Sequence, residues 1–99
     1  MASSKDYLNF IAEQLSELGE ITFRAMMGEY LIYYCGRIIG GIYDNRFLVK
    51  PTKSVEILMP NAKKKLPYDG AKEMFLVDDV DDKEFLKKLL KAIYDDISN

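Results

Sequence analysis

The sequence predicts an α+β fold: a mainly antiparallel sheet of about five strands with flanking helices. Short runs rich in β-branched and aromatic residues follow one another between residues 21 and 50, separated by glycines or by an Asp-Asn pair. Segments with apolar residues at helical spacing lie toward the two ends of the chain. With 99 residues and 48% hydrophobic content, residues 1–99 are expected to form a single packed domain.

The first helix is expected to begin at Ser3 or Ser4, because a serine oxygen can accept a free amide of the first turn. It should run to about Leu18. Its apolar residues recur at helical spacing and predict one buried face: Tyr7, Leu8, Ile11, Leu15 and Leu18. Gly19 suits the left-handed position that commonly follows a helix.

The strands are expected at residues 21–26, 30–35, 37–43 and 46–50. Asp44-Asn45 is the clearest turn, since both residue types tolerate the positive φ of a two-residue hairpin. Gly40-Gly41 falls inside a strand. There a glycine pair indicates a β-bulge or a close backbone approach more often than a phosphate cradle.

After the predicted meander, Thr52 can cap a short helix to about Met59, which Pro60 ends because it lacks an amide donor. Residues 61–70 are polar and contain a proline and a glycine, so they predict an exposed loop. Residues 73–77 are expected to form the fifth strand.

Asp81 and Glu84 form a predicted capping box for the last helix. Its apolar residues make a broad stripe that should face the core: Phe85, Leu86, Leu89, Leu90, Ile93 and Ile97. The expected order of elements is α-β-β-β-β-α-β-α.

The residue types restrict the chemistry that the chain can perform. The sequence contains no histidine, so a Ser-His-Asp or Cys-His device is excluded. No GxxxxGK[ST] phosphate loop occurs. The acids at 78, 79, 81 and 82 lack the spacing of a calcium loop and suit a helix start instead. We therefore expect no catalytic residues, no metal and no cofactor.

Cys35 is the one cysteine, so no internal disulfide can form, which fits a reducing compartment. We expect it to be a buried or half-buried structural thiol. The N-terminal residues lack the apolar segment of a secretory signal, and the apolar runs are shorter than the roughly 20 residues of a membrane helix. These observations predict a cytoplasmic protein with no membrane contact.

Charge argues against direct nucleic-acid binding. The net charge is −2, and the lysines at 63, 64 and 65 fall in the predicted exposed loop. Such a run most often only solubilises a surface, although Tyr68 nearby could stack on a base. Arginine, which is better suited to base and phosphate contacts, occurs only at 24, 37 and 46.

The meander also carries a family likeness. The segment Arg24–Tyr30 (RAMMGEY) is followed by residues 31–34 (LIYY), Gly36, residues 40–43 (GGIY) and residues 47–50 (FLVK). In this order and spacing the chain resembles the N-terminal domain of the TfoX/Sxy competence regulators. The likeness covers nearly the whole chain, and it is carried by many small pieces rather than by one chemical signature.

The resemblance implies a regulator of DNA-transformation competence that acts with transcription factors of the cyclic-AMP receptor type. The sequence has no room for the second, C-terminal domain of those regulators, so we expect a stand-alone, non-enzymatic protein-interaction module. Met and Tyr are favoured at interfaces, which makes one surface the candidate partner site: Arg24, Met27, Gly28, Glu29 and Tyr30. The alternative is that the methionines and tyrosines of this segment only pack in the core.

Two other functions remain open at this point. A small-ligand-binding domain would need a concave pocket lined by tyrosines and Arg24, and a direct nucleic-acid binder would show a steep salt dependence. The sequence predicts no particular oligomeric state.

Overall fold

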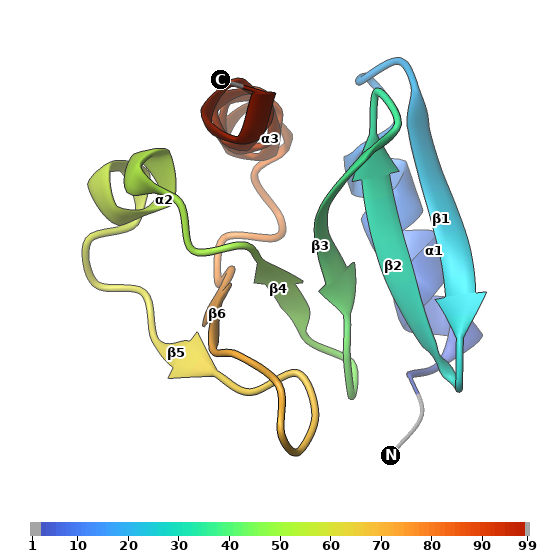
Figure 1. Cartoon of the computed structure of the whole chain (residues 1–99). Coiled ribbons are helices and arrows are strands. Elements are labelled where there is room, and N and C mark those ends of the chain that lie inside the picture. Colours follow the sequence, from blue (N-terminus) through green and yellow to red (C-terminus); the bar gives the residue numbers. More distant parts are fainter. Residues whose placement is uncertain (1–2, 99) are drawn as a thin grey trace.

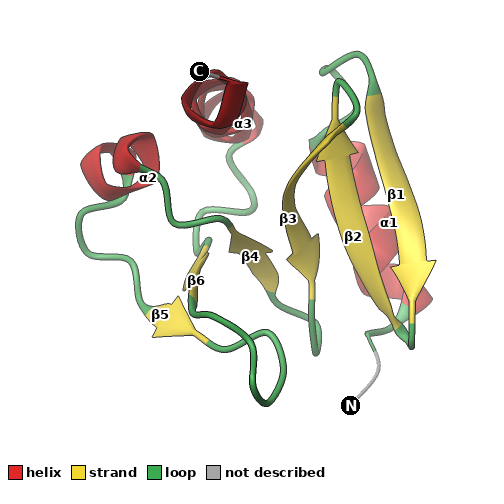
Figure 2. Ribbon diagram, viewed as in Figure 1, coloured by secondary structure: helices red, strands yellow, loops and turns green. Residues whose placement is uncertain are grey.

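The computed structural model describes residues 3–98. Figure 1 labels the elements of this part of the chain: α1 (Lys5–Gln14), β1 (Ile21–Met26), β2 (Glu29–Tyr34), β3 (Arg37–Ile42), β4 (Phe47–Val49), α2 (Lys53–Leu58), β5 (Lys64–Lys65), β6 (Met74–Leu76) and α3 (Lys83–Ser98). The strands form a 6-stranded sheet in the order β1-β2-β3-β4-β6-β5, and all neighbours are antiparallel. Figure 2 shows the helices beside this sheet, so the predicted α+β class is confirmed.

Strand β5 was not predicted, because residues 61–70 were expected to be an exposed loop. In the structure Lys64 and Lys65 pair with Phe75 and Met74 at the edge of the sheet. The Lys64 ammonium lies 5.8 Å from the centre of the Phe75 ring, close enough for a cation–π contact. Lysine has little β propensity of its own, so this strand depends on its neighbour β6.

Consecutive hairpins of the meander use two-residue turns whose central residues all have positive φ. The values are 52° and 87° at Met27-Gly28, 52° and 81° at Cys35-Gly36, and 53° and 56° at Asp44-Asn45. Such turns match the twist of the flanking strands. The prediction for Asp44-Asn45 is confirmed. Cys35, expected to end a strand, instead lies in a turn.

Gly40 and Gly41 occupy the irregular part of β3. The β2–β3 register shifts between Ile32 and Tyr33, which accommodates one extra residue in β3. A Cβ on Gly40 would lie 2.2 Å from the Leu48 carbonyl oxygen. The glycine pair therefore serves a bulge and a close backbone approach, as the sequence predicted.

One hydrophobic core joins one face of the sheet to the three described helices. Its buried members are Ile11, Leu15, Leu18, Ile32, Ile39, Ile42, Phe47, Val49, Val55, Phe75, Val77, Leu86, Leu89, Leu90 and Ile93. Alternation along a strand places Leu48 on the opposite face, together with its partners Gly41 and Leu76. Leu48 is nevertheless fully buried. The second face of the sheet is thus covered as well, at least over β4.

Helix α1 is shorter than predicted. Its N-cap is Ser4, whose Oγ accepts the Tyr7 amide at 3.1 Å, but the helix ends at Gln14 rather than near Leu18. Leu18 remains buried in the connection to β1. The left-handed residue of this connection is Glu20, with φ of 62°, and not Gly19. The apolar spacing correctly predicted that Leu18 is buried, but this burial does not require Leu18 to be helical.

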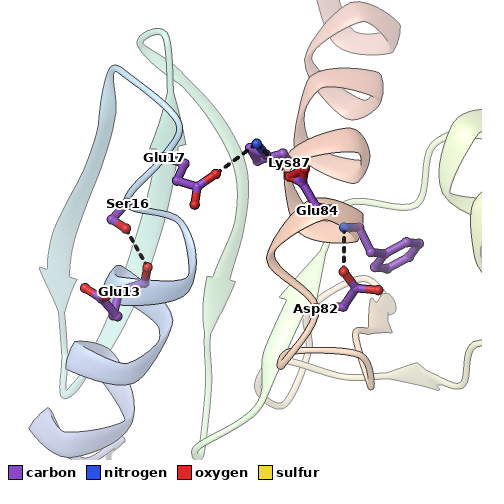
Figure 3. Close-up of polar contacts among 7 residues, drawn as sticks. Glu13, Ser16, Glu17, Asp82, Glu84 and Lys87 are labelled. Carbon is purple, nitrogen blue, oxygen red and sulfur yellow. Dashed lines mark hydrogen bonds and ion pairs between the residues drawn. The ribbon is translucent and has the colours of Figure 1, made fainter.

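The caps of the other two helices differ in detail from the prediction. Thr52 is the N-cap residue of α2, as predicted, but its side chain makes no capping hydrogen bond. Asp82, not Asp81, caps α3: its Oδ1 accepts the Phe85 amide at 3.0 Å. Glu84 pairs with Lys87 instead of reaching back to the cap, with Oε2 and Nζ 2.6 Å apart. Figure 3 shows Asp82 at the start of α3, and Glu84 beside Lys87. The acidic pair Asp81-Asp82 made the cap ambiguous by one residue.

Two polar links tie the helices to the rest of the domain. Lys87 Nζ also lies 2.9 Å from Glu17 Oε1, which joins α3 to the segment after α1 (Figure 3). Hydrogen bonds to Glu84 and Glu17 raise the pKa of Lys87 to about 12. Asp96 near the end of α3 accepts the Ser54 amide at 2.8 Å and the Ser54 hydroxyl at 3.0 Å, and thereby holds the start of α2.

We predict that Gly40→Ala destabilises the protein by about 3 kcal/mol or more, because its methyl group would collide with the backbone of β4. Gly19→Ala is the matched control. Nothing lies within 4 Å of a Cβ at position 19, so the change there should stay within about 1 kcal/mol. Urea unfolding followed by circular dichroism measures both variants. Equal stabilities would contradict the close approach.

We predict that Asp96 makes stability depend on acid pH. Its hydrogen bond from the Ser54 amide lowers its pKa below the ordinary 3.8. Ionised Asp96 therefore stabilises the folded state above pH 3.8, and this stabilisation is lost as pH falls through the folded-state pKa. At pH 7, Asp96→Asn should melt at a lower temperature than the unsubstituted protein. This difference in melting temperature should narrow as the pH falls through the folded-state pKa of Asp96. Asp95→Asn, which removes a carboxylate at the exposed neighbouring position, is the matched control.

Candidate functional site

The tip of the β1–β2 hairpin carries the most exposed apolar side chain of the described residues. Met27 is 97% exposed, and its neighbour Gly28 adopts a φ of 87°. Arg24 is also exposed and lies on β1, where its Cα faces that of Leu31 on β2. Alternation directs its side chain to the face opposite the core. Arg24 and Met27 are therefore both available to a partner.

Glu29, predicted as a partner contact, uses its carboxylate inside the chain. Oε1 accepts the Ser3 amide at 2.9 Å and the Ser3 hydroxyl at 2.6 Å. The Asp44 amide donates to both carboxylate oxygens, at 3.2 and 3.1 Å. The side chain thus links the start of the chain to two hairpin turns. Its role in the structure is to hold these segments together.

Further hydrogen bonds complete this link, which we call the N-terminal clasp: Ser3, Ser4, Glu29, Asp44 and Asn45. The Asn45 amide donates to Ser3 Oγ at 3.0 Å, and the Ser4 amide donates to Asn45 Oδ1 at 2.8 Å. The Ser3 amide also reaches the Gly28 carbonyl oxygen at 3.0 Å. Sequence reasoning treated these serines only as caps. A contact across this separation leaves no local pattern that could have predicted it.

Tyr30 also points inward. It is half-buried and packs against the core, and its Cα pairs with Ala25 on one side and Ile42 on the other. The structure therefore divides the predicted partner residues into two groups. Arg24 and Met27 face solvent, Gly28 shapes the turn, and Glu29 and Tyr30 support the hairpin from within.

Strand β1 forms one edge of the sheet. The Cys35 amide donates to the Glu20 carbonyl oxygen at 3.0 Å, which fixes the alternation of hydrogen bonds along the hairpin. It follows that the amide and carbonyl groups of Ile21, Phe23 and Ala25 point away from β2. Within residues 3–98 no other strand pairs with this edge.

The opposite edge of the sheet is protected, whereas β1 is not. Strand β5 has only two residues, Lys64 and Lys65, and short lysine-rich edges resist pairing with other chains. Strand β1 has six residues, ITFRAM, with one charge and no proline, and its pairing with β2 shows no register shift. Apart from Arg24, this edge lacks the devices that usually block association.

Cys35 is half-buried, as predicted, in the turn between β2 and β3. Desolvation and the neighbouring Glu20 raise the pKa of its thiol. A raised pKa keeps the thiol protonated at neutral pH, where it is a weak nucleophile. The geometry gives no support for a reactive cysteine.

The acidic segment before α3 borders an open hollow lined by Asp78, Asp79, Asp81, Asp82 and Glu84 together with Gln14 and Lys83. Within the described part of the chain, no group of three or more His, Cys, Asp and Glu side chains could hold a metal ion. Of these acids, Asp82 caps α3 and Glu84 pairs with Lys87, so both already have partners within the chain. No helix in residues 3–98 is long and apolar enough to span a membrane.

We predict that Met27→Asn stabilises the protein by about 0.5 to 1 kcal/mol, because asparagine adopts positive φ at lower cost than methionine. Met27→Ala should change stability by less than about 1 kcal/mol, as expected for an exposed side chain. Denaturant melts of both variants test this. A loss of about 2 kcal/mol or more for Met27→Ala would instead indicate a packed side chain.

Comparison with known proteins gives a family but no activity. No protein-family model matches this chain. The chain is 34% identical over 80 residues to the uncharacterized 12.7 kDa protein in the trpE 5′ region of Spirochaeta aurantia. The match covers 81% of this chain and 70% of that protein. At this identity and coverage, the chain belongs to the family of the Spirochaeta aurantia protein.

Proposed function

We propose that this domain is a non-enzymatic protein-interaction module whose partner binds at the β1–β2 hairpin. The observation that carries the proposal is the open edge of β1 beside the exposed Met27. An extended segment of a partner can add to such an edge through main-chain hydrogen bonds. We infer that the protein works in the cytoplasm.

Several contacts of the described residues support this assignment. The outward groups of Ile21, Phe23 and Ala25 offer donors and acceptors to a seventh strand. Arg24 stands beside this edge and can pair with a carboxylate of the partner, while Met27 offers a flexible apolar contact at the tip. The N-terminal clasp fixes the hairpin through hydrogen bonds to Glu29. The hairpin therefore loses little conformational entropy when a partner binds.

The resemblance to the TfoX/Sxy N-terminal domain suggests the kind of partner. In this proposal the partner belongs to the transcription machinery, and the module acts in regulation of competence. The match to the Spirochaeta aurantia protein neither supports nor opposes this part, because that protein is uncharacterized. Direct binding of nucleic acid is not part of the proposal.

We predict that Arg24→Ala and Met27→Ala weaken partner capture while leaving the fold intact. Immobilised protein is incubated with native lysate, and the captured proteins are quantified by mass spectrometry. Ala25→Pro tests the edge itself, since it removes an amide that points away from β2. Ala25→Val is its matched control, because valine keeps the amide and favours strands.

The proposal requires that Ala25→Pro abolishes capture and that Ala25→Val retains it, with both variants folded by circular dichroism. Capture that is unchanged in stable Arg24→Ala, Met27→Ala and Ala25→Pro variants would reject the hairpin as the binding site. If the captured proteins depend on the hairpin but include no transcription proteins, the regulatory role is rejected and the interaction module is kept.

A further inference from the structure

A groove of about 440 Å³ lies on the face of the sheet that is opposite the main core. Its floor includes Ile38 and Gly40 of β3, and the connection between β5 and β6 lines one side. Pro51 and Ile97 line it at the end of the sheet near α3. Its volume falls within the range of pockets that hold small molecules.

One wall of the groove is aromatic. The Tyr43 ring lies over Gly41, since a Cβ on that glycine would be 2.6 Å from a Tyr43 ring carbon. The Tyr68 ring packs on Tyr43 with centroids 6.3 Å apart and planes inclined by 51°. Met74 lines the groove beside them, and its thioether favours contact with aromatic rings. Tyr68 is 57% exposed, so much of its ring is free to stack on a ligand.

The polypeptide holds this wall in place. Arg46 donates from Nε to the Tyr43 carbonyl oxygen at 3.1 Å and from Nη2 to the Leu66 carbonyl oxygen at 3.4 Å. One guanidinium thus joins the β3–β4 hairpin to the segment that leads to Tyr68. The Ala71 amide donates to the Tyr68 carbonyl oxygen at 3.2 Å, which tightens the loop.

The charged side chains that line the groove carry a net positive charge. Lys50 and Lys72 supply two ammonium groups against the single carboxylate of Glu73. Within residues 3–98, neither lysine takes part in an ion pair. A lysine near an apolar wall suits a ligand that carries one negative charge beside a flat ring system.

We infer that this groove binds a small planar aromatic monoanion, such as an aromatic carboxylate. The ring stacks on the exposed Tyr68, which the buried Tyr43 ring supports, and the carboxylate pairs with Lys50 and Lys72. Arg24 takes no part, because it lies on β1 and is not among the residues lining the groove. This site is independent of the hairpin edge, so either assignment can fail without the other.

The test uses the ¹⁵N-labelled full chain and two probes with the same ring, 1-naphthoate and the uncharged 1-naphthamide. The expected result is saturable amide shifts at Ile38, Gly40 and Ala71, with naphthoate binding more tightly. Tyr68→Ala should weaken both probes. The double variant Lys50→Gln/Lys72→Gln should weaken naphthoate about tenfold and leave naphthamide within about twofold.

Lys91→Gln, at an exposed lysine of α3 outside the groove, is the control and should leave both affinities unchanged. The spectrum of each variant without ligand checks that it is folded. Three results would each overturn the inference: no saturable shifts, shifts centred on other residues, or a naphthoate preference that survives the lysine substitutions.

Discussion

The structure depends on backbone conformations that most side chains disfavour. Each hairpin of the meander turns through two residues with positive φ. Four of these residues hold left-handed conformations without being glycine: Met27, Cys35, Asp44 and Asn45. These turns set the pairing of the first four strands. A slip of one residue would move the core side chains of the slipped strand to the other face of the sheet. The hydrophobic core compensates for turn conformations that two of these residues adopt only at a cost.

The N-terminal clasp turns this local constraint into a long-range one. Glu29 receives donors from Ser3 and Asp44, so two hairpin turns and the first helix are held by one carboxylate. The turn at Met27 is therefore fixed by the hydrogen bonds of the nearby Glu29, while the Met27 side chain remains in solvent. A rigid scaffold that presents an exposed loop is a common arrangement for binding surfaces. The proposed docking hairpin has this arrangement.

The sequence was sufficient for the fold class because the strands and the last helix each carry a strong apolar period. It was insufficient where a tertiary contact, and not the local sequence pattern, decided the structure of a segment. Leu18 is buried without being helical, and Lys64 enters a strand because β6 lies beside it. Asp82 rather than Asp81 caps α3, a choice between adjacent acids that only geometry decides.

The candidate site was predictable to the same limited degree. In the segment RAMMGEY, the strand to Met26 and the turn at Met27-Gly28 were predicted correctly, whereas Glu29 begins β2 instead of ending the turn. Arg24 and Met27 are exposed. The internal role of Glu29 could not be predicted, because its donors come from distant positions. The aromatic groove was also missed. A pocket lined by tyrosines was one of the alternatives, but nothing local pairs Tyr43 with Tyr68 or separates them from Arg24.

The sheet order also bears on how the chain folds. Strands β1 to β4 follow one another through short turns, so their pairing costs little loop-closure entropy. Strand β6 must instead cross α2 and β5 in sequence before it reaches β4. Until it arrives, the apolar strand FLV is an open edge in the partly folded chain. We expect the docking of β6 to limit the rate of folding, and the chain to be most prone to aggregation before that step.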